Sequence, residues 1–229
     1  MLDADAAKKH FYKGQLIHLV SYGALLTICL ITVDWKALSQ QSLWGIQGRL
    51  IFILSLAMAP LHHFYVWYVW RSELCYHRIS PLFKGKGFRV YGVGFAVIAL
   101  VRVLSVLLVG VADDSSIKMH WVLTWIDGPL MAALALYAVY STHRYFGYER
   151  AIGGDHFFDK YKEMPFVRKG IFRYSSNSMY MFGLMLILLP GIWCSSEAAL
   201  ILGVYHYIAG WIHYFCTERP DINVIYGNE

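Results

Sequence analysis

The stretch that decides the fold is MYMFGLMLILLPGIWCSSEAALILGVYHYIAGWIHYFCT, residues 179–217, in which two apolar runs follow each other closely. Pro190-Gly191 stops the first run, so we expect the chain to turn back and form a membrane-embedded hairpin of two helices. The hairpin is preceded by RYSSNSMYMFG, residues 173–183, and followed by TERP, residues 217–220. It therefore brings polar, aromatic and acidic side chains to one side of the membrane.

Outward from this hairpin, apolar runs continue over most of the chain. The 229 residues are 58% hydrophobic, against about 45–50% for an ordinary soluble domain, and the mean hydropathy is +0.45. Each run has about 16–22 residues, near the length that crosses a bilayer. The sequence predicts an all-α, polytopic membrane protein with about six transmembrane helices, at residues 16–33, 49–70, 90–111, 120–140, 179–194 and 197–217.

The Lys and Arg residues predict how these helices are oriented. Sixteen of the 20 lie before the first predicted helix, after the second, after the fourth or after the sixth. Three lie in the segments on the opposite side, and Arg102 lies within a helix. By the positive-inside rule, both termini are expected in the cytoplasm. The net charge of +5 then follows from topology and contact with anionic lipid, so no nucleic-acid partner is expected.

The segment 141–178 is expected on the same cytoplasmic side. It has 38 residues, which is long for a connection between two helices. Aromatic residues such as Phe157, Phe158 and Phe172 indicate that part of it lies on the membrane surface. A soluble molecule from the cytosol could reach this segment and both open ends of the hairpin. We therefore expect an active site on the cytoplasmic side.

The last predicted helix carries an aromatic stripe that ends in a carboxylate. At helical spacing Tyr207, Trp211, Tyr214 and Glu218 share one face. Aromatic rings attract cations and the Glu adds a negative charge, so the stripe suits a cationic ligand. The alternative is an aromatic belt at the membrane interface, which is common in membrane helices.

Other polar residues lie inside the predicted helices. His206 and His213 are seven residues apart, but no Cys, Asp or third His lies at ligand spacing beside them, so we expect packed histidines and no metal. Arg102 and Asp127 lie at matching depths in the third and fourth helices. Because intramembrane charges are usually paired or functional, we expect these two residues to form a structural ion pair.

Several motifs in residues 120–227 resemble those of the phosphatidylethanolamine N-methyltransferases and the related isoprenylcysteine carboxyl methyltransferases. Asn177-Ser178-Met179-Tyr180 with Gly183 resembles an Asn/His-Pro-x-Tyr-x-Gly motif, and Glu218-Arg219-Pro220 resembles Glu-Glu-Pro. Gly153-Gly154-Asp155-His156-Phe157 resembles a Leu-Gly-Asp-Tyr-Phe segment, and Ala133-Leu134-Ala135 stands where the family carries Gly-x-Gly. The chain departs from the family at Ser178, at the extra Phe182, at Arg219 and at the two alanines.

The resemblance implies S-adenosylmethionine as methyl donor and the ethanolamine headgroup of phosphatidylethanolamine, in the cytoplasmic leaflet, as acceptor. It implies a donor site that includes Ala133, Ala135, Asp155, Asn177, Tyr180, Gly183, Tyr214 and Glu218. The acceptor amine must lose a proton before it attacks, and His156 and Glu218 are the candidate bases. Arg168 and Arg173 are candidates for binding the lipid phosphate, although both also fit as determinants of topology. No metal is implied.

Other functions stay open at this point. An isoprenylcysteine carboxyl methyltransferase or a thiol methyltransferase would share the donor site, and a reductase of related fold would need a nicotinamide cofactor. A transporter or scaffold is the alternative outside the enzymes, but the sequence has no internal repeat of the kind that many transporters show. We expect a single domain, residues 1–229, with scaffold helices in 1–119 and a methyltransferase core in 120–229. Its membrane is expected to be the bacterial inner membrane or the endoplasmic reticulum.

Overall fold

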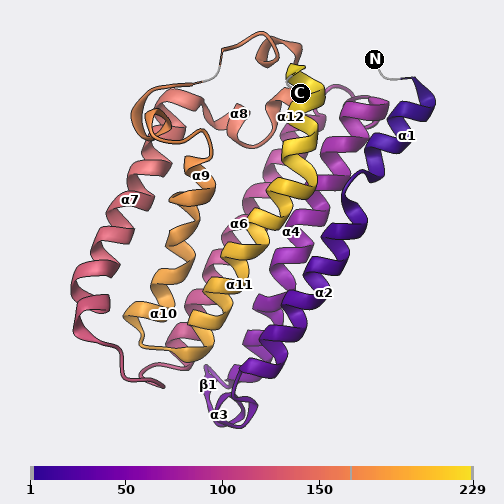
Figure 1. Ribbon diagram of the computed structural model, residues 1–229. Coiled ribbons are helices and arrows are strands. Elements are labelled where there is room, and N and C mark those ends of the chain that lie inside the picture. The colour runs from indigo at the N-terminus through magenta and orange to yellow at the C-terminus, as the bar shows by residue number, and fades with distance from the viewer. Residues whose placement is uncertain (1–2, 166, 228–229) are drawn as a thin grey trace.

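The computed structural model describes residues 3–165 and 167–227, which form a bundle of long helices (Figure 1). The long helices are α2 (Gln15–Thr32), α4 (Gly48–Tyr76), α6 (Gly87–Ala112), α7 (Gly128–Ser141) and α11 (Glu197–His213). Shorter helices are α1 (Ala4–Tyr12), α3 (Trp35–Gln40), α5 (Ile79–Leu82), α8 (Tyr148–Ala151), α9 (Ser178–Met181), α10 (Leu189–Trp193) and α12 (Arg219–Tyr226). Two short antiparallel strands, β1 (Ser42–Leu43) and β2 (Ile46–Gln47), form a small hairpin.

Short turns of other helix types join these elements. The π-helical turns are η1 (Leu123–Asp127), η2 (Thr142–Phe146) and η7 (Tyr214–Glu218). The 3₁₀ turns are η3 (Gly154–His156), η4 (Asp159–Tyr161), η5 (Gly170–Arg173) and η6 (Gly183–Leu188). A π turn holds one more residue than an α turn and so rotates the side chains that follow it, which is why π turns recur at functional sites.

Five of the described helical stretches are long and apolar enough to cross a membrane, which confirms the predicted all-α, polytopic membrane fold. They are Ala4–Thr32, Gly48–Tyr76, Gly87–Ala112, Leu123–Phe146 and Glu197–Tyr226. Their outer faces carry exposed apolar side chains such as Leu16, Ile31 and Trp125. Such faces suit contact with lipid, because the helices satisfy their own backbone hydrogen bonds.

The fifth predicted helix takes a different form. Residues Ser178–Trp193 are a shorter apolar stretch, built from α9, η6 and α10 instead of one α-helix. This broken arm packs against α11, so the predicted hairpin is present with one arm short. Gly203 on α11 permits the close approach, since a Cβ there would lie 2.9 Å from the backbone oxygen of Ile187.

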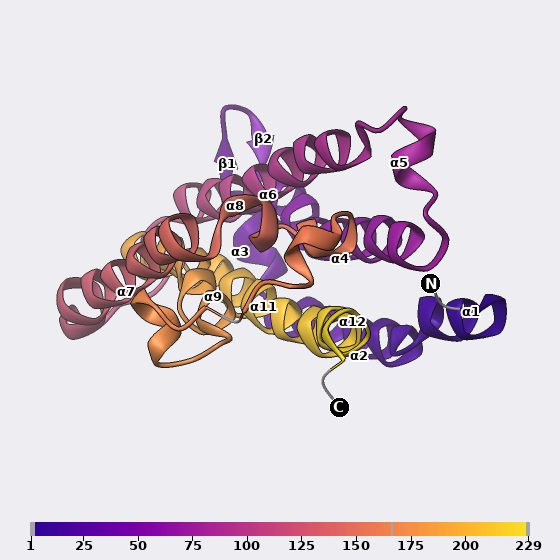
Figure 2. The ribbon, with the colours of Figure 1, turned by 90° about the horizontal axis from the view of Figure 1, so that it is seen from above.

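An apolar core joins α2, α4, α6 and α11. Phe52, Val106 and Leu202 are completely buried in it. Seen from above, α7 and α9 stand to one side of these helices, and α8 lies across the end of the bundle (Figure 2). Both α1 and α12 lie at this end, which we call the upper end, whereas α3 and β1 lie at the opposite end (Figure 1).

The predicted ion pair between Arg102 and Asp127 is wrong. Arg102 on α6 donates hydrogen bonds to His206 on α11 and to His63 on α4. Asp127 lies in η1, and it takes part in none of the ion pairs among the described residues. Equal depth in the membrane did not imply adjacency, because α6 packs mainly against α4 and α11.

Candidate active site

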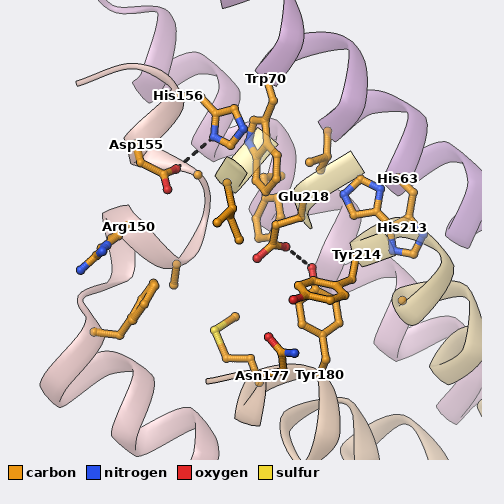
Figure 3. Close-up of a pocket in the computed structure, with 18 of the residues that line it drawn as sticks. His63, Trp70, Arg150, Asp155, His156, Asn177, Tyr180, His213, Tyr214 and Glu218 are labelled. Atoms are coloured by element: carbon orange, nitrogen blue, oxygen red, sulfur yellow. Dashed lines mark hydrogen bonds and ion pairs between the residues drawn. The ribbon is translucent and has the colours of Figure 1, made fainter. Parts of the chain in front are cut away.

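A cavity of about 310 Å³ lies between α4, α6, α8, α9, α11 and α12. Its volume falls at the lower end of the range of about 300–1,000 Å³ that is usual for small-molecule sites. Apolar and aromatic side chains such as Val66, Phe95 and Leu184 form much of the wall. A limited set of polar groups converges on the interior, and Figure 3 shows how they lie.

Glu218 and Tyr180 point toward each other in this cavity (Figure 3). The phenol of Tyr180 donates a hydrogen bond to Oε2 of Glu218. The ring of Tyr180 also packs against Trp211 and Tyr214, with ring centroids 5.7 Å and 5.1 Å apart. Glu218 ends the π turn η7, so its side chain is rotated relative to a continuous α-helix. The two arms of the hairpin thus combine a carboxylate with three aromatic rings.

His156 lies on the opposite wall between two carboxylates. Its Nδ1 is 3.0 Å from Oδ1 of Asp155 and its Nε2 is 3.3 Å from Oδ2 of Asp221. Its ring stacks on Trp70 of α4, with centroids 4.3 Å apart and an interplanar angle of 24°. A neutral imidazole has only one N–H, so contacts of both nitrogens with carboxylates favour the imidazolium form.

The pKa values of His156 and Asp155 follow from these contacts. Burial alone would lower the pKa of His156, but the hydrogen bonds and negative charges of Asp155 and Asp221 outweigh burial and raise the pKa of His156 to about 9. Burial alone would raise the pKa of the Asp155 carboxyl, but the hydrogen bond and charge of His156 lower that pKa overall. His156 is therefore mainly a cation at neutral pH.

Asp221 is held in place from the N-terminal half of the chain. Its Oδ1 accepts hydrogen bonds from Nε of Arg71, at 2.9 Å, and Nε2 of His10, at 2.8 Å. Arg71 is completely buried and also donates to the backbone oxygens of residues 10, 11 and 13 and of residues 216 and 217. This cation therefore joins α4, the turn between α1 and α2, and the start of α12.

The structure brings together six of the residues that the sequence assigned to the site. They are Asp155, His156, Asn177, Tyr180, Tyr214 and Glu218, and all line the cavity. Ala133, Ala135 and Gly183 are not among its lining residues, and Ala135 is completely buried in α7. Arg168 and Arg173 are exposed and line a second, shallow cavity. The two cavities adjoin, since both are lined by Phe172 and Ser176.

Sequence reasoning missed several residues of the site. Trp70 carries no motif that marks it, and Arg150 counted only toward topology. Arg150 is nearly buried, and its guanidinium donates to the phenol of Tyr226 at 3.2 Å. Tyr226 in turn donates to Oδ2 of Asp155 at 3.0 Å. Arg219, the cation in place of the family's second Glu, is exposed and is not among the lining residues.

Histidines from three helices meet below His156. Nitrogens of His18, His63 and His213 lie within 4.8 Å of one another, so His213 does have histidine neighbours that spacing along the chain could not show. Both ring nitrogens of His63 already have partners, Tyr22 and Arg102. The guanidinium of Arg102 also opposes a divalent cation at this place. The cluster fits the packed histidines expected from the sequence better than a metal centre.

The fold and the cavity together define a class of protein: a polytopic, helical membrane protein whose acidic and aromatic site lies at the upper end of a helical hairpin. A family model described as phospholipid methyltransferase matches residues 123–229. The match covers 107 of the 229 residues and agrees with the family that the sequence motifs resemble. No curated protein and no solved structure gives a match.

Proposed function

We propose that the protein transfers methyl groups from S-adenosylmethionine to the ethanolamine nitrogen of phosphatidylethanolamine. The observation that carries the proposal is the contact between Glu218 and Tyr180, which places a hydrogen-bonded carboxylate inside an aromatic-walled cavity. The family match supports a methyltransferase acting on phospholipid. The acceptor nitrogen and the donor are the further steps that we add.

The cavity residues fit the methyl donor. A sulfonium cation is attracted by a carboxylate and by aromatic faces, and Glu218, Tyr180 and Tyr214 supply both. Asn177, at the same end of the cavity, adds an amide that could bind polar parts of the donor. When bound, S-adenosylmethionine supplies an electrophilic methyl group. The protein's own part is to bind and orient the reactants and to exclude water from them.

We assign the role of proton acceptor to Glu218. An ethanolamine amine is protonated at neutral pH and must lose that proton before it can attack a methyl group. Of the two candidate bases, His156 already carries a proton on each nitrogen, because its contacts raise its pKa to about 9. Glu218 is partly buried, faces the cavity and accepts a hydrogen bond from Tyr180, so it can take the proton. Holding both reactants in line would contribute about 7–11 kcal/mol at most.

We assign His156 a positioning role. Its cation lies between Asp155 and Asp221 and stacks on Trp70, so it fixes the wall that faces Glu218. Arg168 and Arg173 remain our candidates for the lipid phosphate, because their shallow cavity adjoins the main one. This arrangement would let the headgroup enter the main cavity while its phosphate stays at the surface.

We also propose that the upper end faces the cytoplasm. It contains both α1 and α12 (Figure 1), and the segments predicted at this end hold sixteen Lys and Arg residues. The donor would then reach the cavity from the cytosol, and the acceptor would come from the cytoplasmic leaflet. Labelling of single cysteines introduced in segment 148–163 with a membrane-impermeant reagent in sealed inside-out vesicles is expected to succeed, and protection there would reverse the orientation.

Radiolabelled methyl transfer tests the function. Purified protein in lipid–detergent micelles is given labelled S-adenosylmethionine with phosphatidylethanolamine, its mono- and dimethyl forms, or a prenylcysteine. We expect label in the ethanolamine lipids, and the product series shows how many methyl groups are added. Label in prenylcysteine alone would move the protein to the carboxyl methyltransferases.

A pair of variants then tests the base. Glu218→Gln is expected to lower kcat by about 100-fold or more, because a general base typically contributes about 10²–10⁴-fold. The matched control is Glu163→Gln, an exposed carboxylate outside the cavity lining, which is expected to keep full activity. Full activity in Glu218→Gln would remove this residue from the proposed chemistry.

A further inference from the structure

The inner end of the cavity contains a buried cation, Arg102. Only 5% of its surface is exposed, and its side chain lines the cavity from α6. Its Nε lies 3.0 Å from Nδ1 of His206 and its Nη2 lies 2.7 Å from the backbone oxygen of the same residue. Its Nη1 lies 2.9 Å from Nε2 of His63 and 3.4 Å from Nδ1 of His62. These acceptors are three imidazoles and a carbonyl.

Arg102 therefore has hydrogen-bond partners but no counterion in the described part of the chain. Among residues 3–165 and 167–227, no carboxylate lies within ion-pair distance of it. A charge buried without an opposite charge is strongly destabilising, and ionisable residues inside membranes mark ligand or ion sites for this reason. Arg71 provides the contrast within this chain, because its buried guanidinium is paired with Asp221.

Arg102 also fixes the tautomers of the surrounding histidines. A guanidinium can only donate, so each ring nitrogen that it contacts must accept and the other nitrogen carries the proton. The remaining nitrogen of His63 has Tyr22 as its partner, and that of His206 lies 3.5 Å from Oγ of Ser55. The remaining nitrogen of His62, Nε2, is buried and has no partner among the residues that the structure describes. His62 is 7% exposed and lines the cavity, so a buried N–H donor lies in the cavity wall.

We propose that Arg102 and His62 form an anion-binding subsite at the inner end of the cavity, which takes a carboxylate or phosphate group of a molecule bound there. A guanidinium without a counterion beside an unused N–H is the donor set that an oxyanion requires. The oxyanion would supply the negative charge that Arg102 lacks and would accept a hydrogen bond from the N–H of His62.

The position of the subsite limits which molecule supplies the anion. Arg102 lines the same cavity as Glu218, so the anion belongs to a molecule that enters this cavity. Given the proposed function, on which this step rests, the two sources are the amino-acid carboxylate of the methyl donor and the phosphate of a second lipid.

Equilibrium binding to the purified full-length protein separates the two sources. The donor arm compares S-adenosylhomocysteine with 5′-methylthioadenosine, which lacks the amino-acid part. The lipid arm compares short-chain phosphatidate with the corresponding diacylglycerol. The variant is Arg102→Gln, and the matched control is Arg49→Gln, an exposed arginine at the other end of the bundle.

We expect Arg102→Gln to weaken the binding of one of the two anionic ligands at least about tenfold. Binding of the counterpart that lacks the anionic group, and all binding by the Arg49→Gln protein, should be unaffected. Loss of S-adenosylhomocysteine affinity assigns the subsite to the donor carboxylate, and loss of phosphatidate affinity assigns it to lipid phosphate. Unchanged affinity for both overturns the proposal. If Arg102→Gln does not fold, Arg102→Lys and His62→Phe replace it, and unchanged affinity in both folded variants is equally decisive.

A last measurement separates this proposal from the proposed function. If the wild-type protein binds neither nucleoside, the methyltransferase assignment fails while the subsite is still open to test with inorganic sulfate. Sulfate is then expected to raise the thermal midpoint of the wild type and of Arg49→Gln more than that of Arg102→Gln. An equal rise in all three proteins overturns the subsite.

Discussion

The phenol of Tyr180 donates a hydrogen bond to the carboxylate of Glu218, and this contact joins two segments that lie 38 positions apart in the chain. The hairpin geometry makes it possible, because the short arm begins at the level where α11 gives way to η7. Hydrogen bonds to a charged group are worth about 1.5–3 kcal/mol. The orientation of the candidate base is therefore set by a residue on the other arm.

The Tyr180→Phe variant tests this dependence. We expect kcat/KM to fall about 10–100-fold, as follows from the loss of one charge-assisted hydrogen bond. Tyr207→Phe is the matched control, because its phenol donates to the backbone oxygen of Met181 and does not line the cavity. Equal activities of the two variants would show that the Tyr180 hydroxyl does not position the carboxylate.

The raised pKa of His156 predicts how stability depends on pH. A histidine whose pKa is higher in the folded than in the unfolded protein stabilises the fold fully below its unfolded pKa of 6.5, and this contribution is lost as the pH rises through about 9. The contribution is at most about 3 kcal/mol. We expect the thermal midpoint of the wild type to fall between pH 7 and pH 10 more steeply than that of His156→Asn, and parallel curves would contradict the assigned charge.

Removal of the Asp221 charge is expected to destabilise the whole upper end. In Asp221→Asn, Arg71 and His156 lose a carboxylate that both contact, and breaking a buried ion pair in this way costs about 3–5 kcal/mol. Asp159→Asn is the control, since Asp159 forms an exposed ion pair with Lys162 and its loss is expected to leave the thermal midpoint unchanged. A small shift in Asp221→Asn would mean that water replaces the lost contacts.

Gly153 is expected to tolerate no side chain. Its φ of +88° lies in the left-handed region, and a Cβ would lie 2.2 Å from the Trp70 ring. Gly85 has a φ of +82° but open space around it, so Gly85→Ala isolates the backbone strain of about 1–2 kcal/mol. Gly153→Ala is expected to lower the thermal midpoint further and to reduce activity, because the ring that stacks on His156 must move. Equal effects of the two substitutions would argue against that displacement.

Arg219 is expected to be dispensable for the chemistry. It is exposed, and its guanidinium lies 6.0 Å from the ring centroid of Phe215, outside the cavity lining. Arg219→Glu, which restores the residue type of the family motif, should change kcat/KM by less than about threefold, as for other surface substitutions. A larger change would place this position in substrate binding.

Much of the architecture could be predicted because hydropathy is a local property of the chain. Apolar runs long enough to cross the bilayer became helices, and the motif residues Asn177, Tyr180 and Glu218 met in one cavity. Ala133 and Ala135 were assigned only from their position where the family carries Gly-x-Gly. They are not among the residues that line the cavity, and their place in the donor site stays a prediction.

What could not be predicted are contacts between segments far apart in the chain. Arg102 was assigned Asp127 from depth alone, whereas its neighbours are histidines on α4 and α11. Trp70 and Arg71 reach the site from a helix that carries none of the motifs. Depth and spacing determine where a residue lies along a helix axis, but the choice of neighbouring helix depends on packing.

Arg71 precedes the matched region, residues 123–229, and donates hydrogen bonds to backbone oxygens at residues 10–13 and 216–217. The matched region therefore depends on contacts from the N-terminal helices. One wall of the cavity and the counterion of Asp221 come from helices that precede it. A fragment that began at residue 120 would contain the motif residues but would lack the surface against which they are arranged. Exchange of the first three membrane-spanning helices between relatives would then change one wall of the cavity while leaving the motif residues in place.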